Sequence, residues 1–367
     1  PIIRVRPIIM PNVQSEWQDG HLRTKISLDA KYTHQSGLIG VMSLTPDFRN
    51  IEDEVESIDF SYTERWYSDR RPFFVEGGGY MPPREMFYSR RIESFDLGMK
   101  LFGTVDRTSI GLLDAYSLAG RNDLALNIRQ RIADQHGAVI GYVRTDQSGA
   151  TNETYHLRGN CRKIIGRGSF RVSARVFQNY TEGSNGGTFW SVSAGRWQGP
   201  GKPGFRANYY HVDPTFDPWD GYVPDTDLEG FSAGVNFWDS FEERRTESYG
   251  ARLSWSSFNH TDGSRYHDDL GLGCWIDYRD GMWWNVSWHR SDRPPNVDNV
   301  QGLYCGWNSK KLHQGGGLGL TWGKRDGADY LYYWLGQGLK LNDKLYCTVG
   351  HEYRESDLSL IHISEPT

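Results

Sequence analysis

The sequence predicts an all-β fold, an up-and-down antiparallel transmembrane β-barrel with about 16–18 visible strands. Three observations support this prediction. Apolar and polar residues alternate through segments of about nine to twelve residues, the length that a tilted strand needs to cross a bilayer. The 367 residues include 14 Trp, 21 Tyr, 16 Phe and 42 Gly, a composition typical of strands and tight turns. Turn sequences separate the alternating segments.

The alternation begins near the N-terminus. Residues 25–32 place Ile26, Leu28, Ala30 and Tyr32 on one side of a strand, with polar residues between them. The same pattern predicts strands over 123–131, 170–176, 231–237, 249–255, 270–276, 284–288, 316–322 and 345–349. No stretch offers the stripe of an amphipathic helix.

Turn signals between these segments indicate hairpins. They are Asp-Gly at 19–20, 262–263, 280–281 and 326–327, Asn-Asp at 122–123 and 342–343, and Ser-Asn-Gly-Gly at 184–187. A soluble stack of sandwiches or propeller blades also fits this spacing. The barrel is favoured because the segments are long and one face is apolar while the other carries Arg, Asp, Asn and Ser. Aromatic residues near segment ends are like those of an interfacial girdle: Trp238, Tyr278, Trp283, Trp307, Tyr330 and Tyr332.

Charge and hydropathy narrow the class of protein. With 41 Lys+Arg against 46 Asp+Glu, the chain lacks the basic excess expected of a nucleic-acid-binding protein. The mean hydropathy is −0.65, and no run approaches the roughly 20 apolar residues of a membrane-spanning helix. These values suit a soluble protein or a barrel, because a barrel interleaves its lipid-facing residues with polar ones.

Four cysteines, Cys161, Cys274, Cys305 and Cys347, are too far apart for the ligand spacing of a zinc site. An even number leaves disulfides open in an oxidising compartment, although each cysteine falls in a predicted strand. The sequence contains no G-x-G-x-x-G, P-loop, G-x-S-x-G or H-E-x-x-H motif, and we expect no metal and no cofactor.

Both ends of the sequence look cut. The chain begins with Pro1, and a signal peptide is neither seen nor excluded. Residues 358–367 resemble a translated sequencing adapter and are predicted to be non-native, although Leu358, Leu360 and Ile363 would also fit a last strand. The predicted native region is therefore a partial barrel domain over 1–357.

Residues 46–95 interrupt the alternation and predict an irregular insertion into this domain. Only 58–64 alternates cleanly within it. The rest is dense in charge and turn residues and contains three distinctive blocks: Thr45-Pro-Asp-Phe-Arg-Asn-Ile-Glu52, Ser68-Asp-Arg-Arg-Pro-Phe-Phe-Val-Glu-Gly77 and Phe87-Tyr-Ser-Arg-Arg-Ile-Glu93.

These blocks resemble the bacterial domain of unknown function 5916 family. The resemblance extends in order over about residues 1–355, through 98–103, 109–115 and a turn at 213–224, while Ser68, Glu93 and the four cysteines depart from it. It implies an outer-membrane β-barrel that is normally preceded by a family 9 carbohydrate-binding-like module, which this sequence does not contain. The family has no established activity.

Three acidic clusters suggest chemistry. Asp213, Asp217 and Asp220 could form a calcium loop, but two intervening prolines disturb the ligand geometry. Glu64 and Glu76 could be a glycosidase pair, although pairing with arginine explains both more simply. The third cluster, His267, Asp268 and Asp269, could act as a metal site or general base, but neighbouring residues on a strand alternate faces and are not expected to converge.

The Arg-rich insertion is the strongest candidate site. Its arginines interleave with carboxylates and aromatic residues, and arginine pairs with a carboxylate through two parallel hydrogen bonds. The predicted binding residues are Arg70, Arg71, Phe73, Phe74, Glu76, Tyr88, Arg90 and Arg91. They predict a salt-bridge network that fills a lumen or, alternatively, a constriction that selects anionic or sugar-like solutes.

The expected function is uptake, export or surface binding of carbohydrate-related material in the bacterial outer membrane. The expected partners are outer-membrane lipid and a carbohydrate or anionic solute, with no nucleic acid. A secreted all-β hydrolase that acts on glycans and a non-porous structural surface protein remain alternatives, and the sequence favours a non-enzymatic role.

Overall fold

The structure is a computed structural model that describes residues 7–18, 21–46, 66–166, 168–342 and 344–356. The chain divides into two compact units. Unit 1 comprises Pro1–Arg162, Ser173–Val192 and His211–Asp227, and unit 2 comprises Lys163–Val172, Ser193–Tyr210 and Leu228–Thr367. The tail at 358–367, the alternating segment 58–64 and residue Glu64 lie outside the described residues.

Among the described residues there are 19 strands and three short helical segments. The strands are β1 (Ile8–Gln18), β2 (His21–Thr33), β3 (Ile39–Leu44), β4 (Leu97–Val105), β5 (Thr108–Ser117), β6 (Arg121–Ala133), β7 (His136–Gln147), β8 (Ala150–Ile165), β9 (Gly168–Thr181), β10 (Gly187–Trp197), β11 (Gly204–Val212), β12 (Leu228–Ser240), β13 (Thr246–Asn259), β14 (Arg265–Tyr278), β15 (Trp283–Arg293), β16 (Asn296–Trp307), β17 (Gly316–Arg325), β18 (Ala328–Lys340) and β19 (Tyr346–Ser356). The helical segments are α1 (Pro72–Val75), η1 (Gly78–Tyr80) and η2 (Ser89–Arg91). Most strands exceed the roughly five or six residues usual in soluble proteins.

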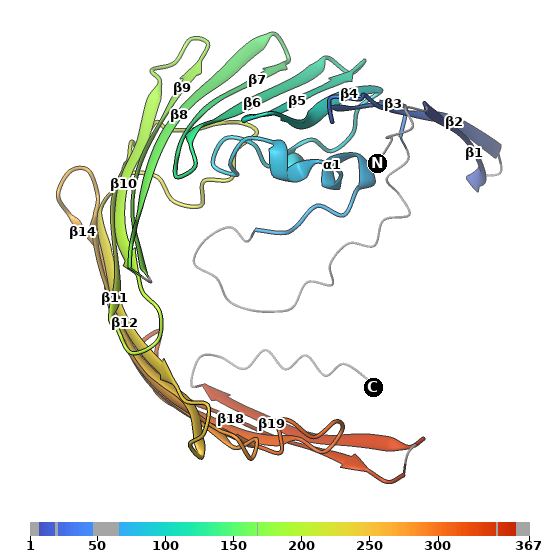
Figure 1. The fold of residues 1–367 in the computed structure, drawn as a ribbon. Coiled ribbons are helices and arrows are strands. Elements are labelled where there is room, and N and C mark those ends of the chain that lie inside the picture. The colour runs from blue at the N-terminus through green and yellow to red at the C-terminus, as the bar shows by residue number, and fades with distance from the viewer. Residues whose placement is uncertain (1–6, 19–20, 47–65, 167, 343, 357–367) are drawn as a thin grey trace. The chain divides into compact units, whose positions relative to one another are not determined.

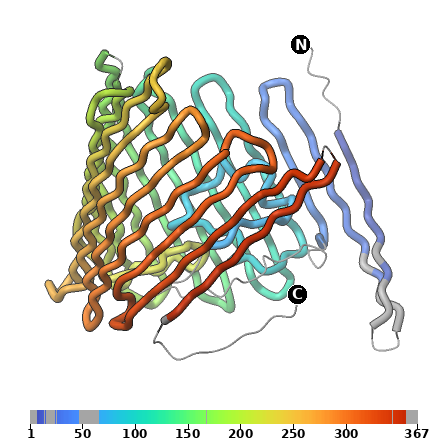
Figure 2. Tube along the Cα trace, turned by 90° about the horizontal axis from the view of Figure 1, so that it is seen from below, coloured from blue at the N-terminus to red at the C-terminus, as the bar shows by residue number. Residues whose placement is uncertain are grey.

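Consecutive strands pair antiparallel, from β1 to β8 in unit 1 and from β12 to β19 in unit 2. Short turns join many of them into successive hairpins (Figure 2). The predicted all-β, up-and-down antiparallel fold is therefore confirmed, with 19 described strands where the sequence predicted about 16–18. The pairings among the described strands do not close the sheet, so the barrel is not confirmed.

The sheet of unit 2 has two chemically different faces. The register forms a cross-strand row on one face, called here the apolar face: Phe237, Ala251, Cys274, Val286, Leu303, Leu320, Tyr333 and Tyr353. The next row lies on the opposite, polar face: Asn236, Arg252, Gly273, Ser287, Gly302, Thr321, Tyr332 and Arg354. On the apolar face large side chains are exposed, with Val286 at 54% and Leu335 at 47%.

The aromatic residues expected to form a girdle are divided between these faces. Strand alternation places Tyr278 and Trp307 on the apolar face, but it places Trp238, Trp283, Tyr330 and Tyr332 on the polar face. Trp283 packs over Gly306 of the neighbouring strand, where an added Cβ would lie 2.2 Å from the indole. The prediction of a girdle that faces one environment is therefore wrong for these four residues. Their positions near strand ends were a misleading signal.

Unit 1 differs because one face of its sheet is covered. Its apolar face carries the cross-strand row Ile110, Ile128, Ile140 and Leu157, of which Ile140 is 58% exposed. On the other face, the row Leu113, Ala125, Val143 and Thr154 is fully buried. Figure 1 shows α1 and the chain around it lying against this face of β4–β7.

The described residues contain no helix with the length and apolar character needed to span a membrane. All four cysteines are free in the structure, which holds no disulfide between them. Cys305 is buried, and the other three are exposed.

Candidate functional site

Two segments of unit 1 cover its sheet. They are called here the insert, residues 66–95 between β3 and β4, and the strap, residues 213–227 after β11. Backbone hydrogen bonds join them: the Tyr88 amide donates to the Asp220 carbonyl at 2.5 Å, and the Tyr222 amide donates to the Arg84 carbonyl at 2.8 Å. The insert and the strap therefore form one packed layer.

The insert has its own apolar core. Pro72 begins helix α1, because its fixed φ suits the first helical position and its missing N–H is not needed there. The helix buries Phe73 and Phe74, whose rings meet edge to face at 5.2 Å, and Phe95 packs on Phe73 at 4.8 Å. Gly77 then turns the chain with φ +69, and a Cβ there would lie 2.5 Å from the Phe102 ring. Only glycine suits both requirements.

The insert also contacts the sheet through its backbone. The carbonyl of Tyr80 lies so close to β5 that a Cβ on Gly111 would be 2.3 Å from it. The buried amide of Asn127 on β6 donates to this carbonyl at 2.7 Å and to the Met81 carbonyl at 3.2 Å. A small residue and a polar residue on the sheet thus fix one end of the insert.

Arg71 bonds to several groups within the insert. Its guanidinium pairs with Asp69 at 2.6 Å and donates to the carbonyls of Ile92 at 2.5 Å and Ser89 at 2.7 Å. It also lies over the Phe74 ring at 4.2 Å. Burial raises the pKa of the Asp69 carboxyl, but hydrogen bonds from Arg71 and Ser89 outweigh burial and hold the pKa below its usual range. Arg71 therefore joins the two halves of the insert.

Glu76 pairs with lysine, contrary to the expected arginine pairing. Its carboxylate forms an ion pair with Lys31 of β2. Buried Lys100 of β4 donates to the backbone carbonyls of Phe73 and Glu76. These contacts hold the end of α1 to two strands, and they give no support to a glycosidase role for Glu76.

The remaining predicted residues have contacts elsewhere in the insert and the strap. Buried Tyr88 accepts from the Tyr67 amide at 3.1 Å and donates to its carbonyl at 3.0 Å. Arg90 lies over the Tyr67 ring at 5.5 Å, and Arg70 is exposed. Arg91 donates through Nε to the Gly221 carbonyl of the strap at 3.3 Å. The eight residues form a packed segment and do not line one cavity.

A buried charge cluster attaches the strap to the sheet. Arg121 at the start of β6 donates to Asp123 at 2.9 Å and to Asp220 at 2.7 Å. Asp220 is 1% exposed, and its second carboxylate oxygen has no hydrogen-bond partner. Burial, followed by the neighbouring Asp123 charge, raises the pKa of Asp220 to about 7.

The carboxylates considered for a calcium loop have separate partners. Asp213 accepts from the Thr188 amide at 2.7 Å and contacts His211 at 2.8 Å, Asp220 contacts Arg121, and Asp217 is exposed. Across the ranges that the structure describes, no three His, Cys, Asp or Glu residues are placed to hold a metal ion.

Sequence reasoning missed the residues that hold the strap from the sheet side. Buried Asn152 of β8 donates to the Asp217 carbonyl at 2.9 Å and accepts from the Trp219 amide at 3.2 Å. Buried Asn179 of β9 donates to Asn152 at 3.2 Å. The sequence did offer one signal, because these polar residues occupy positions in strands close to turns. That signal did not specify the partners of the two asparagines.

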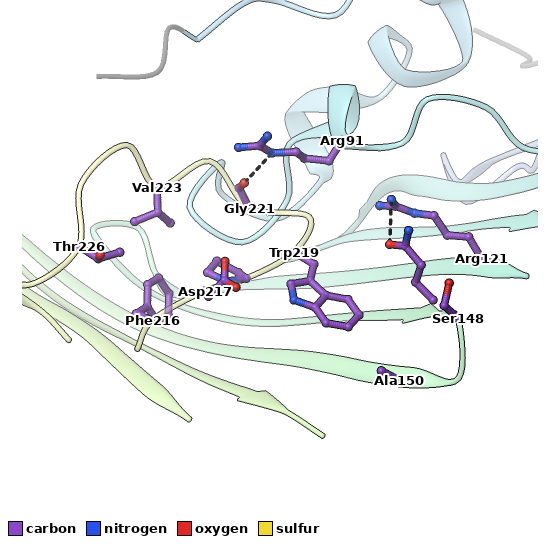
Figure 3. A pocket seen from close by; sticks show the side chains of 12 residues that line it. Arg91, Arg121, Ser148, Ala150, Phe216, Asp217, Trp219, Gly221, Val223 and Thr226 are labelled. Atoms are coloured by element: carbon purple, nitrogen blue, oxygen red, sulfur yellow. Dashed lines mark hydrogen bonds between the residues drawn. The ribbon is translucent and has the colours of Figure 1, made fainter. Parts of the chain in front are cut away.

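Residues of the insert, the strap, the β7–β8 hairpin and the start of β6 line an open pocket of about 690 Å³. Figure 3 shows Arg91 reaching toward Gly221, with Arg121 and Trp219 among the lining side chains. Arg121 donates to the Gln147 side chain at 3.4 Å. Of the predicted binding residues, Arg91 alone is among those that line it.

The His267 cluster in unit 2 corrects one expectation. His267 and Asp269 are two positions apart on β14, so they share a face and their side chains lie 3.2 Å apart. His289 of β15 approaches the same carboxylate at 3.9 Å. Asp268 is on the opposite face and pairs with Arg265 at 2.5 Å. Convergence thus occurs for two of the three residues, where none was expected.

Comparison with known proteins agrees with the resemblance found in the sequence. The family model described as a domain of unknown function, DUF5916, matches residues 3–132. This range includes the three distinctive blocks, whereas the turn at 213–224 lies beyond it. No curated protein and no solved structure matches the chain. The resemblance to the DUF5916 family is therefore confirmed over residues 3–132.

Proposed function

We propose that this chain is part of an outer-membrane β-barrel whose insert and strap form a plug, and that the protein takes up, exports or binds small solutes. The observation that carries the proposal is the exposed apolar face of long antiparallel strands. In unit 2 it extends in register across eight strands, with a polar, glycine-containing row on the other face. Lipid on one side and water on the other would suit these two faces.

The insert supports the role of a fixed plug more than that of an open gate. Arg71 donates hydrogen bonds to Asp69 and to backbone carbonyls within the insert. The Lys100 side chain binds the backbone of the insert to β4. Displacement of the insert would separate these charged groups from their partners and leave them buried without compensation. The segment therefore resists displacement. In a closed barrel this plug would narrow the lumen and restrict passage to small solutes, for which we propose carbohydrate-related or anionic compounds.

The first experiment tests the membrane wall. Full-length protein extracted in detergent should migrate differently on gels before and after boiling, because a closed barrel satisfies all of its backbone groups and resists detergent. Solubility without detergent, together with unchanged mobility after boiling, would refute the proposal.

The second experiment tests which face contacts lipid. Leu253 and Ser254 are adjacent on β13, both are exposed, and they lie on opposite faces. After replacement of the native cysteines, Leu253→Cys should react with a lipid-soluble thiol reagent and Ser254→Cys with a water-soluble one. Equal labelling of both variants by the water-soluble reagent would indicate a soluble sheet.

A further inference from the structure

We infer that one face of β6–β8, beside the insert, binds a polyanion, a dissolved compound that carries two or more phosphate groups. The site is called here the arginine face and consists of Arg129 and Arg131 of β6 with Arg158 and Arg162 of β8. This inference names a solute class for the proposed function and rests on that function for its biological role. Binding itself requires only unit 1, which contains all four arginines.

The register of the sheet brings the arginines to one face. Arg129 and Arg158 are both partners of Val139 on the intervening strand β7, so they lie two strand spacings apart, about 10 Å. Arg131 follows Arg129 by two positions, about 7 Å along the strand, and its partner Gly137 has no side chain. The guanidinium groups therefore stand around a part of β7 that carries only small side chains.

The arginine face begins where the insert ends. Asn127 precedes Arg129 by two positions, is buried beneath the insert and donates to the Met81 carbonyl at 3.2 Å. Arg129 donates to the same carbonyl at 3.2 Å but is itself exposed. The other three arginines are exposed as well, and strand alternation places Arg162 on the same face as Arg158. A solute in water can thus reach all four side chains.

Carboxylates are scarce on this face of the sheet. Within the described strands β4–β8, strand alternation places a single carboxylate on it, that of Asp123. Asp123 is 1% exposed and already pairs with Arg121 at 2.9 Å.

Three of the four arginines consequently keep their charge uncompensated. Among the described residues, no carboxylate forms an ion pair with Arg129, Arg131 or Arg162. The exposed turns at this end hold Asp106 and Asp134, but they also hold Arg107, so the end of the sheet remains positive.

The chemistry of the arginine face suits phosphate groups. Each planar guanidinium can donate two parallel hydrogen bonds to a phosphate. Neighbouring positive charges repel one another, and a bound anion relieves this repulsion. One phosphate is too small to reach arginines about 10 Å apart on two strands, whereas a chain of phosphates can engage both. A compound with several phosphate groups is therefore favoured over a single phosphate.

The experiment is calorimetric titration of the protein, folded in an uncharged detergent, with tripolyphosphate, inorganic phosphate and glucose. Tripolyphosphate should bind at least about tenfold more tightly than phosphate, and glucose should not bind. Raising NaCl from about 50 mM to about 500 mM should weaken tripolyphosphate binding at least about tenfold, because salt screens exposed charges. Equal binding of the two phosphates, or binding that salt does not weaken, would overturn the inference even if the gel experiment shows a stable barrel. Selective binding by a protein without barrel behaviour would refute the proposed function alone.

Variants locate the binding to the arginine face. Arg131→Gln should weaken tripolyphosphate binding at least about threefold, and the double change Arg129→Gln with Arg131→Gln at least about tenfold. Arg131→Lys should retain most of the affinity because it keeps the charge. Arg252→Gln is the matched control, since Arg252 is an exposed arginine on the polar face of unit 2, and it should leave the affinity unchanged. Equal affinities of Arg131→Gln, the double variant and the control, with wild-type melting temperatures in all three, would exclude the arginine face as the site.

Discussion

The two units carry the same kind of strand but treat the second face of the sheet differently. In unit 1 the row Leu113, Ala125, Val143 and Thr154 is fully buried beneath the insert and strap. In unit 2 the polar-face row includes exposed Arg252 and Arg354. The apolar faces of both units nevertheless expose large side chains such as Ile140 and Val286. The apolar faces of the two units are therefore alike. The units differ in the opposite face, which is covered in unit 1.

This contrast explains why polar residues matter more in unit 1. Asn127, Asn152 and Asp220 are each nearly fully buried and bond backbone or charged groups of the covering layer. A buried polar group that loses its partner is strongly destabilising, whereas an exposed group can return to water. Substitutions on the covered face should consequently have larger effects than similar ones in unit 2.

The largest effect is expected for Arg71→Ala. This change removes the guanidinium from the part-buried Asp69 carboxylate and from two carbonyls, and we expect it to lower the free energy of unfolding by about 3–5 kcal/mol. Arg252→Ala on the polar face of unit 2 should change it by less than about 1 kcal/mol, because Arg252 is exposed. Denaturant titration of detergent-folded protein measures both. Equal changes would show that the contacts of the insert and the strap contribute no more to stability than those of an exposed arginine.

Burial of Asp220 predicts a pH effect in unit 1. The pKa of Asp220 is about 7 in the folded chain and near 3.8 when unfolded, so the folded state binds the proton more tightly between these values. The contribution of Asp220 to stability should therefore be greatest at about pH 4 and below, and it should fall by roughly 2–4 kcal/mol as pH rises to about 7. Above pH 7 both states are ionised, and the dependence from Asp220 ends.

The matched variant for this effect is Asp220→Asn, which keeps the shape of the side chain and removes its titration. Denaturation midpoints between pH 4 and pH 8 should lose the component due to Asp220 in this variant. If wild type and variant show the same slope across the window, another group controls the pH response.

The sequence carried enough information to predict the strands but not the contacts of the insert and the strap. Period-two alternation at Ile26, Leu126 or Leu272 requires only that neighbours on a strand face opposite sides, which is a local rule. The distinctive blocks of the insert also indicated the DUF5916 family, which the match over residues 3–132 confirms.

The contacts of the cover depend on residues far apart in the chain. Arg121 meets Asp220 across 99 positions, and Asn152 meets Asp217 across 65. No local pattern specifies such partners. The predicted pairing of Glu76 with arginine was wrong for the same reason, because Lys31 and Lys100 come from strands on either side of the insert. The order of charges in the insert showed that pairing would occur, but it did not show with which residues.

The smallest effects should come from a matched pair of glycines, which tests the contrast without altering any charge. Gly111 on the covered face of β5 lies under the Tyr80 carbonyl, and a Cβ there would be 2.3 Å from that oxygen. Gly234 on the polar face of β12 has the Leu253 carbonyl as its nearest neighbour, at 3.4 Å. Gly111→Ala must displace the insert and should destabilise by about 1–3 kcal/mol. Gly234→Ala meets only an ordinary contact and restricts the unfolded chain, so it should be neutral or stabilising by less than about 1 kcal/mol.

Limited proteolysis of the insert adds a second readout, since Gly111→Ala should speed cleavage between residues 66 and 95 while Gly234→Ala should not. If both variants left stability and cleavage unchanged, the insert would not be packed against β5, and the contrast between the two units would lose its main structural basis.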